Sequence, residues 1–419
     1  MALRYSALLS VVLALGLQRP VAGRTLRFVN LIFRHGDRSP TQTYPTDPYT
    51  EKDWPQGFAQ LTQVGMRQQY ALGQYLRHRY NDFLNSIYDR NEIYVQSTDI
   101  DRTLMSAEVN LAGLYPPQGR QIFHSDLKWQ PIPVHTMPVE NEKFLKFPRK
   151  NCPRYQQLQE ETMKSRAVQE KIHENKDFLD MVSNKTKMKV TIENEWRVYD
   201  TLFCEKTHNL TLPSWATQEV IARLGELNDF GVEFLFRLHK TADKSRLQGG
   251  LLLKQILQNI NQAINESAPA PRRKLIMYSS HDVTLIALQM ALNVYNSIIP
   301  PYATCYMLEL FQEDDRSFTI DMYLKNQSDS QSEPHLLILP NCTRHCPLQD
   351  FIRLTKHLIT DNWEMECKIV DESVHAGMIL GVMLGVCFAM LILFGIILYW
   401  CWNYKSQRHR VPTSSDELA

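Results

Sequence analysis

Residues 25–40 read TLRFVNLIFRHGDRSP, and this stretch decides the fold of the chain. Its first part is mostly apolar, which is typical of a buried strand. The second part places Arg34, His35, Asp37 and Arg38 within five positions. Such a cluster is either a solvated loop or a turn that binds an anion and directs a histidine toward it. The rest of the sequence has to distinguish between these two possibilities.

Two further segments repeat the layout of an apolar strand, a polar turn and a helical stretch. EIYVQST (residues 92–98) is followed by DIDR (99–102) and a helical pattern. KLIMYSS (274–280) is followed by His281, Asp282 and another helical pattern. Strand-then-helix units predict a mainly parallel sheet flanked by helices, in which ligands bind beyond the carboxyl ends of the strands. All three polar turns belong to that edge.

The middle of the chain differs in character from these units. Residues from about 133 to 246 are charged, helix-prone and poor in strand signals. We therefore expect an inserted helical domain within a larger domain of residues 24–374, whose length exceeds that of a usual single core. The predicted fold class is α/β.

The two ends of the chain have the composition of targeting segments. Residues 1–23 combine a basic residue, an apolar run and a small-residue cleavage site, as in a secretory signal peptide. Residues 376–399 are 24 positions without a charge, enough for a transmembrane helix. Basic residues follow, so residues 400–419 are expected in the cytosol. The sequence predicts a type I membrane protein with residues 24–374 on the lumenal or extracellular side.

The composition limits the partners and the compartment. A formal net charge of +1 leaves no basic footprint, so nucleic acid is not an expected partner. Six of the eight cysteines are lumenal, where disulfides form, but their spacing leaves fifteen pairings open. Glycosylation is expected at the lumenal Asn-x-Ser/Thr sequons, which begin at Asn184, Asn209, Asn265, Asn326 and Asn341.

The three polar turns could form one site. If they converge, they bring together Arg34, His35, Asp37, Arg38, Asp99, Asp101, Arg102, His281 and Asp282. Three guanidinium groups and a histidine can hold a phosphoryl group by paired hydrogen bonds. No glycine-rich phosphate loop or metal-ligand spacing occurs, so we expect no metal and no other cofactor. One neutral histidine could then attack phosphorus, and Asp282 could protonate the departing oxygen.

Plainer interpretations remain open at this point. A His-Asp pair more often caps the start of a helix than takes part in catalysis. An Asp-Arg pair is usually structural. Only the coincidence of all three turns at the ends of strands favours a catalytic site.

The residues Arg34-His35-Gly36-x-Arg38-x-Pro40 form the signature of the histidine acid phosphatases, which this chain resembles. Longer stretches, among them STDIDRTLMSAEVNLAGLYPP, HNLTLPSWAT and KLIMYSSHD, are similar to the prostatic and lysosomal members in particular. The resemblance covers nearly the whole ectodomain. It implies a mixed α/β sheet with a helical insertion, and hydrolysis of phosphate monoesters at acidic pH.

The resemblance implies a role for each residue of the site. His35 is the expected nucleophile, forming a phosphohistidine, and Asp282 is the expected proton donor. The expected phosphate ligands are Arg34, Arg38, Arg102 and His281. His35 must be neutral although activity is expected below its usual pKa of about 6.5, so the arginines should lower that pKa. Asp37 or a backbone carbonyl could fix its tautomer, and Asp282 must carry a proton up to about pH 6.

The resemblance also implies disulfides and an assembly. The expected bridges are Cys152–Cys367, Cys204–Cys305 and Cys342–Cys346. Relatives are commonly homodimers, and the segment around Trp129 matches one near their dimer contact. The lysosomal membrane and the plasma membrane are both expected locations, because Tyr404 lacks the apolar residue that would complete a Tyr-x-x-apolar sorting signal.

The sequence departs from the family pattern at two places, and two other functions remain possible interpretations. The third turn reads SSHDV where relatives usually have SAHDT, and Gln96 replaces a usual arginine. Neither touches a catalytic position, so they bear on substrate preference rather than on chemistry. The alternatives are a phytase-like or other phosphotransferase of the same superfamily, and a receptor or adhesion ectodomain with a vestigial site.

Overall fold

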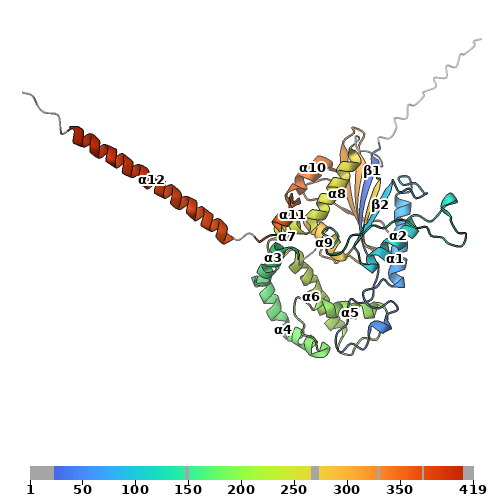
Figure 1. Ribbon diagram of the computed structural model, residues 1–419. Coiled ribbons are helices and arrows are strands. Elements are labelled where there is room, and N and C mark those ends of the chain that lie inside the picture. The colour runs from blue at the N-terminus through green and yellow to red at the C-terminus, as the bar shows by residue number, and fades with distance from the viewer. Residues whose placement is uncertain (1–22, 147–150, 266–272, 328–330, 370–371, 409–419) are drawn as a thin grey trace, which may run out of the picture. The chain divides into compact units, whose positions relative to one another are not determined.

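The computed structural model describes residues 23–146, 151–265, 273–327, 331–369 and 372–408. The expected signal peptide therefore lies outside the described residues, as does most of the expected cytosolic tail. The chain divides into two compact units, Met1–Cys367 and Lys368–Ala419. The first unit contains the sheet (Figure 1).

The strands that precede the three polar turns lie side by side and are parallel. They are β1 (Thr25–Arg34), β2 (Ile93–Ser97) and β3 (Leu275–Ser280), in the order β2-β3-β1. In register, Phe33 of β1 and Ser97 of β2 both pair with Ser279 of β3. The three strands therefore end at the same edge of the sheet, as the sequence predicts.

The other half of the sheet is antiparallel. It consists of β4 (Cys305–Gln312), β5 (Phe318–Lys325), β6 (His335–Leu337) and β7 (Cys346–Pro347). β4 pairs with β1 and β5, and β5 pairs with β6 and β7. The sheet is mixed, as the resemblance implies, but the expectation that it is mainly parallel is wrong, because parallel pairing among the described strands is confined to β1, β2 and β3. The tight connection between β4 and β5, in which Glu313 N–H bonds to the Ser317 carbonyl, requires antiparallel strands.

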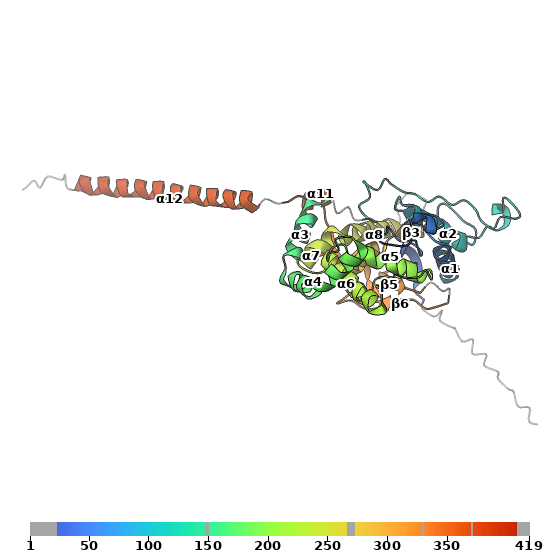
Figure 2. The same ribbon diagram turned by 90° about the horizontal axis from the view of Figure 1, so that it is seen from below.

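Helices cover both faces of the sheet. The first unit contains α1 (Gln63–Arg79), α2 (Asp101–Leu114), α3 (Pro153–Met163), α4 (Arg166–Thr186), α5 (Trp196–Thr207), α6 (Gln218–Phe236), α7 (Thr241–Leu247), α8 (Gly249–Ile264), α9 (Asp282–Ala291), α10 (Leu348–Thr355) and α11 (Trp363–Glu366). Short 3-10 turns lie at Glu51–Asp53, Gly119–Gln121 and Lys356–Leu358. Figures 1 and 2 show α1 and α2 on one side of the sheet and α8 on the other.

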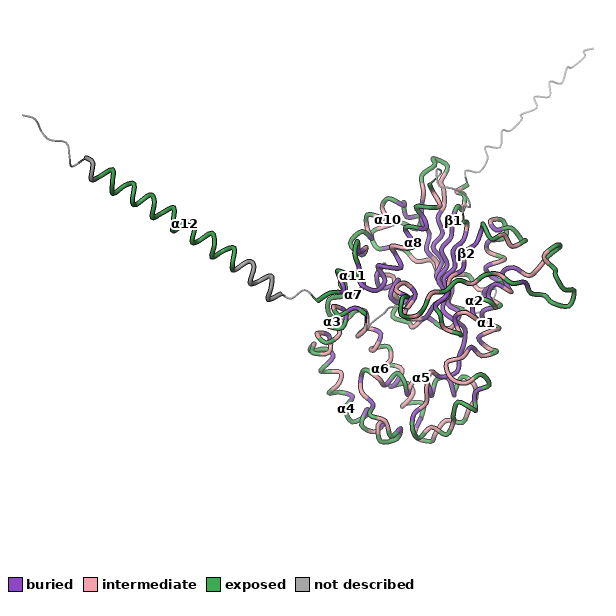
Figure 3. The backbone as a smooth tube through the Cα atoms, in the orientation of Figure 1, coloured by how far each residue is buried: buried purple, intermediate pink, exposed green. Residues whose placement is uncertain are grey.

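The alternation of side chains along β1 builds a core on each face. Val29, Leu31 and Phe33 pack with the apolar side chains of α1 and α2, whereas Phe28 and Ile32 pack with those of α8, α9 and α10. This is the period of two that a strand requires when both faces are covered. Figure 3 shows the resulting band of buried strands. The turn after β1 is thereby fixed by two cores at once.

The region expected to be an inserted helical domain contains α3 to α7. Between Cys152 and Gln248 the structure has no strand. Phe178, Val182, Leu202 and Leu224, from α4, α5 and α6, belong to a separate hydrophobic cluster. These helices therefore have a core of their own beside the sheet.

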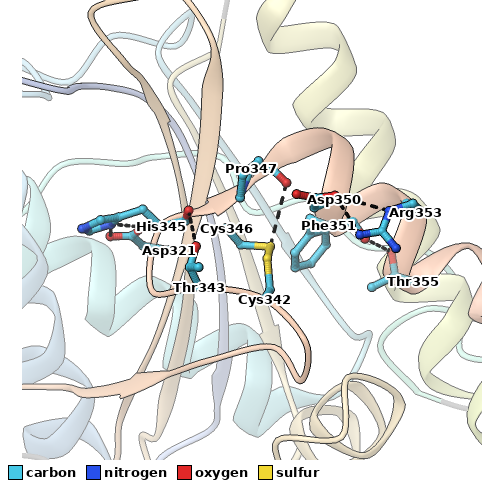
Figure 4. The surroundings of a disulfide bond; sticks show 10 residues. All are labelled: Asp321, Cys342, Thr343, His345, Cys346, Pro347, Asp350, Phe351, Arg353 and Thr355. Atoms are coloured by element: carbon cyan, nitrogen blue, oxygen red, sulfur yellow. Dashed lines mark hydrogen bonds and ion pairs between the residues drawn. A yellow bond between two sulfur atoms is a disulfide. The ribbon is translucent and has the colours of Figure 1, made fainter.

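Two of the three expected disulfides are present. Cys152 is bonded to Cys367, and Cys342 is bonded to Cys346 in the short segment before α10 (Figure 4). The expectation of a Cys204–Cys305 bridge is wrong for this structure, because both thiols are free and buried. Cys204 Sγ lies near Arg38 and Asp200, while Cys305 packs in the core under α1 and α2. The two thiols therefore lie in different surroundings and are not bonded to each other.

The second unit is dominated by one long helix, α12 (Glu372–Arg408). Its segment Gly381–Lys405 is long and apolar enough to cross a membrane, by length and composition only. It overlaps the expected span at residues 376–399. In the first unit the sequon asparagines Asn184, Asn209, Asn265 and Asn341 are exposed, and Asn326 is half-buried.

Candidate active site

The side chain of His35 is placed where β1 ends and the RHG turn begins. It is 2% exposed, and its Nδ1 lies 2.8 Å from the Gly36 carbonyl oxygen. A carbonyl can only accept a hydrogen bond, so Nδ1 carries the proton. The lone pair of Nε2 is therefore available. Of the two groups expected to fix this tautomer, the backbone carbonyl does so and Asp37 does not.

The turn needs a glycine after His35. A Cβ atom on Gly36 would lie 2.4 Å from the carbonyl oxygen of Gly65, at the start of α1. The Gly36 N–H donates to Ser106 Oγ of α2 at 3.1 Å. Thr62 caps α1 by accepting from the Gly65 N–H at 3.2 Å. The amino end of α1 thus packs directly on the turn and holds the histidine in place.

Each of the three arginines is held by a different set of partners. Arg34 forms an ion pair with Asp282 at 2.7 Å and donates to the Pro300 carbonyl at 2.6 Å. Arg38 makes two parallel hydrogen bonds to the carboxylate of Asp200, at 2.8 and 3.1 Å. Arg102 has a single long contact, 3.4 Å to the Ala59 carbonyl.

All three guanidinium groups keep a free donor. The Nε atoms of Arg34, Arg38 and Arg102 are buried, and none has a hydrogen-bond partner among the described residues. An unpaired buried donor is costly, and a charged one more so. Three such donors around one histidine are the arrangement that an oxyanion with several oxygens would complete.

The third turn brings a second histidine to the first. His281 caps α9, and its ring lies edge-on to that of His35, with the centroids 5.6 Å apart. Its Nε2 lies 3.1 Å from the hydroxyl of Thr98, at the end of β2. Asp282 is the first residue of α9 and faces Arg34. The structure therefore brings together all six residues expected to bind or transfer phosphate.

The pKa values of both histidines are lowered. The pKa of His35 lies well below its usual 6.5, because burial and then the charges of Arg102 and Arg34 disfavour the protonated form. Burial, followed by the charge of Arg102, lowers the pKa of His281 to about 3. The expectation that the arginines depress the pKa of His35 agrees with this, although burial is the larger cause.

The carboxyl of Asp282 does not behave as expected. Burial alone would raise its pKa, but the charge of Arg34 and the backbone N–H of Val283 outweigh burial and hold the pKa below its usual 3.8. The expected proton donor is a carboxyl that carries a proton up to about pH 6. The structure instead pairs the carboxylate of Asp282 with Arg34.

Three of the acidic residues in the turns make their hydrogen bonds with residues other than the expected phosphate ligands. Asp37 lies at the lining of the same cavity, but its carboxylate accepts from His208 Nε2 at 2.8 Å and from the Thr62 hydroxyl. Asp99 and Asp101 are exposed, and Asp101 accepts from Gln60 at 3.2 Å. Asp37 instead ties the turn to α1 and to the end of α5.

The sequence did not indicate two residues that support the site. Asp200, on α5, holds Arg38 and also accepts from the backbone and hydroxyl of Thr41, at 3.1 and 3.0 Å. The ring of Tyr302 lies 4.2 Å from the guanidinium carbon of Arg34. Asp200 is 162 positions from Arg38 in the chain, and no motif connects the two.

The site opens into a large cavity. Its volume is about 1610 Å³, and its lining includes Arg34, His35, Arg38, Arg102, His281 and Asp282 together with residues of α5 and α6. The sheet edge therefore supplies the floor and the helical region supplies a wall. Room for a group much larger than phosphate remains above His35.

The class of protein can be stated from this geometry and from the extent of the sequence match. Residues 25–325, which contain the sheet edge and all six of these residues, match the histidine phosphatase superfamily, branch 2. The match covers well over half of the chain, and the chain belongs to this family.

Within the family, its similarity to individual proteins is high. It is 51% identical to the lysosomal acid phosphatase of Homo sapiens over 397 residues, which cover 94% of this chain and 92% of that protein. It is 50% identical to the prostatic acid phosphatase of Bos taurus over 369 residues, covering 88% of this chain and 94% of that protein.

Solved structures show the same fold at much lower identity. The apo phytase of Hafnia alvei matches with a TM-score of 0.60 and 16% identity, covering 83% of this chain and 99% of its own. The phytase of Citrobacter braakii matches with a TM-score of 0.61 and 17% identity, covering 83% of this chain and 100% of its own. At these identities the likeness concerns the fold alone.

Proposed function

We propose that the chain is an acid phosphatase that hydrolyses phosphate monoesters through a phosphohistidine at His35. The observation that carries the proposal is a buried imidazole that is protonated at Nδ1 and lies amid three arginines whose Nε donors have no partner in the part of the chain that the structure describes. The identity of about half the chain with lysosomal and prostatic acid phosphatases supports it.

The reaction needs two displacements at phosphorus. The arginines and His281 bind the phosphoryl oxygens, and His35 Nε2 attacks phosphorus while the bond to the ester oxygen breaks. Asp282 gives its proton to the departing oxygen, which leaves as an alcohol. Water then attacks the phosphohistidine and passes a proton back to Asp282. Inorganic phosphate leaves, and the imidazole is restored.

The pairing of Asp282 with Arg34 suggests why such an enzyme works at acidic pH. Beside Arg34 the pKa of Asp282 lies below its usual value, so the carboxyl must gain a proton before it can donate one. A bound phosphate competes for Arg34 and adds negative charge beside the carboxylate, which raises the pKa of Asp282. At acidic pH the solvent can then protonate the Asp282 carboxylate.

Rapid-quench labelling tests the nucleophile. Wild-type protein mixed with a radiolabelled aryl phosphate and quenched in alkali, where phosphohistidine survives, should carry label. His35→Ala should carry none and should turn over no ester. The matched control is His78→Ala on the exposed face of α1, which should label like wild type. Label on the His35→Ala protein would contradict the proposal.

The alternatives fit the site less well. A phytase-like enzyme would meet many phosphates and would need a basic wall, whereas the wall formed by α5 and α6 carries carboxyl groups. A vestigial receptor would have no reason to keep a buried histidine with three partly unpaired arginines, because that arrangement lowers stability without a ligand.

Location and assembly follow the same proposal. The C-terminal helix and the lysosomal relatives fit a lysosomal membrane protein, with the plasma membrane as the other location. The phosphatase unit would face the lumen or the cell exterior. A homodimer would cover the apolar side chains of Ile122, Phe123, Leu127 and Trp129, which are 39 to 62% exposed.

A further inference from the structure

The loop before α3 adds a lysine to the lining of the cavity above His35. Lys146 lines that cavity together with Arg102 and His281, and it is half-buried. Its ammonium group forms no ion pair or hydrogen bond within the part of the chain that the structure describes. The cavity therefore contains a positive charge whose partner is not a described side chain.

The turn that precedes Lys146 is fixed by buried residues. Leu145 is fully buried and belongs to the same hydrophobic cluster as Leu285 of α9. The buried carboxyl group of Glu142 accepts the backbone N–H groups of Phe144 and Leu145, at 2.7 and 2.9 Å. These contacts satisfy the backbone of the turn inside the protein. Lys146 therefore extends from a well-held segment, although its own side chain is partly exposed.

The same turn is bonded to the helix that begins beside the second histidine of the site. The hydroxyl of Thr284, in the first turn of α9, donates to the Leu145 carbonyl oxygen. The same hydroxyl oxygen accepts from the His281 N–H at 3.3 Å. Two hydrogen bonds thus connect the residue next to Lys146 with His281. They place the lysine beside the third polar turn.

The charge of Lys146 acts on the phosphate site. Burial and then the charge of Arg102 lower its pKa below the usual 10.5. Burial and the charge of Arg102 are the larger causes of the lowered pKa of His281, and the charge of Lys146 adds to them. Only fully buried lysines lose their proton near neutral pH, so a half-buried one is still an ammonium ion at acidic pH.

The phosphoryl group that is transferred already has its cations. Arg34, Arg38 and Arg102 surround His35 and offer it three buried Nε donors without a partner among the described residues. A fourth cation beside them is repelled by their charges, which costs free energy unless an anion offsets it. A second negative group on the substrate, outside the arginines, would supply that anion.

We propose that Lys146 binds a second anionic group, a carboxylate or a phosphate, on the leaving group of the substrate. Preferred substrates would be phosphate monoesters of small hydroxy acids, or small bisphosphates, in which the second charge lies a few bonds from the ester oxygen. Both kinds of group are ionised above about pH 5. This inference rests on the proposed phosphatase activity and narrows its substrate class.

Matched pairs of esters test the charge. The full-length protein in detergent micelles is assayed at about pH 5.5, where a carboxyl group is ionised. Phosphate esters of ω-hydroxy acids of three and four carbons are compared with esters of the matching primary amides, which have the same shape and no charge. Propane-1,3-diol bisphosphate is compared with propyl phosphate, with a correction for its two reactive groups.

In wild type, kcat/KM should favour the anionic member of a pair by about tenfold, the order expected of one charge-assisted hydrogen bond. A preference in both comparisons, or in one of them, supports the inference. The pair that shows it identifies the preferred anion as a carboxylate or a phosphate.

Substitutions then locate the effect. Lys146→Met keeps an unbranched side chain and removes the charge, so the preference should fall to about twofold or less. Lys146→Arg keeps the charge and should retain most of the preference. The matched control is Lys143→Met, because that lysine lies in the same loop but pairs with Glu364 outside the cavity. Its loss should leave the preference unchanged.

Equal kcat/KM for every charged ester and its neutral counterpart in wild type would overturn the inference, and this comparison does not depend on how any variant folds. An equal loss on charged and neutral esters in Lys146→Met would also overturn it, because the lysine would then act on the phosphoryl group that all the esters share. Failure of wild type to hydrolyse any of the esters would contradict the proposed phosphatase function instead.

Discussion

Two of the three site arginines are already paired with a carboxylate before any substrate binds. Arg34 is held by Asp282 and Arg38 by Asp200, whereas Arg102 forms no ion pair with the described carboxylates. The pairs fix the guanidinium groups in position, which lowers the reorganisation needed when phosphate arrives. They also mean that phosphate must compete with Asp282, and that competition links substrate binding to the protonation of the donor.

Replacing Asp282 should therefore slow the hydrolysis only of esters whose leaving-group oxygen needs a proton. Asp282→Asn should still form the phosphoenzyme from aryl phosphates, whose leaving groups depart as stable anions, but should fail with alkyl phosphates. Rapid-quench labelling with one ester of each kind measures the difference. Equal losses on both esters would remove Asp282 from the role of proton donor.

Asp200 should affect turnover more than phosphate binding. Asp200→Asn removes a negative charge from the cavity, so inhibition by inorganic phosphate should be unchanged or stronger. The freed Arg38 should nevertheless lower kcat about tenfold, a loss of about 1.4 kcal/mol of transition-state stabilisation, and Asp200→Glu should restore part of it.

The control for Asp200 is Asp180→Asn, which breaks an exposed ion pair on α4. It should change neither constant. A kcat for Asp200→Asn within twofold of wild type would show that Asp200 does not position Arg38.

At the level of the elements, the two disulfides close loops of very different length. Cys152–Cys367 spans 215 positions and ties the start of α3 to the end of the first unit, whereas Cys342–Cys346 spans 4. A cross-link stabilises largely by restricting the unfolded chain, and the restriction grows with loop length. The long bridge should contribute more.

Removing the long bridge tests this argument. Cys152→Ser with Cys367→Ser should lower the free energy of unfolding by about 2–5 kcal/mol and reduce secretion. The matched control, Cys342→Ser with Cys346→Ser, should cost clearly less. Thermal melting of both double variants is the measurement, and equal or reversed losses would contradict the loop-length argument.

The stability of the whole molecule should depend on pH in a particular way. The pKa values of Glu195 and Glu205 are raised to about 8, chiefly by burial. Between pH 4.5 and 8 the unfolded chain releases these protons and the folded protein keeps them, so the free energy of unfolding falls as pH rises. His35 and His281 have the opposite effect below pH 6.5: the unfolded chain binds protons at these residues and the folded protein does not, so the free energy of unfolding rises with pH.

Below pH 6.5 the effects of the histidines and the glutamates on the free energy of unfolding offset each other. Above pH 6.5 the histidines no longer contribute, and the effect of the glutamates remains. The free energy of unfolding should be nearly constant from pH 4.5 to 6.5 and should fall toward pH 8 by up to about 1.4 kcal/mol per pH unit for each glutamate, and Tm should follow it. Glu205→Gln should halve the decline, while the exposed Glu219→Gln should leave it unchanged. A Tm that rises between pH 6.5 and 8 in wild type would contradict this account.

Local patterns predicted most of the catalytic half of the sheet. The strand that begins at residue 25 and the helical segments expected after residues 102 and 282 depend on neighbours in the chain, so periodicity reveals them, and the helices observed there begin at Asp101 and Asp282. The antiparallel half of the sheet could not be predicted in the same way. A continuous apolar strand such as Cys305–Gln312 does not by itself indicate which strand it pairs with.

Strand and turn patterns along the chain were enough to predict that a histidine and three arginines follow the ends of parallel strands, and such strands end at a common edge of the sheet. Which charges meet at that edge depends on how the elements pack. Asp37 and Asp282 both belong to the expected site, yet one bonds to His208 and the other to Arg34. Asp200 and Cys204 come from the helical region, where their positions depend on how α5 packs over the sheet edge. Electrostatic and hydrogen-bond partners are set by distances in space, and those distances come from packing rather than from order along the chain.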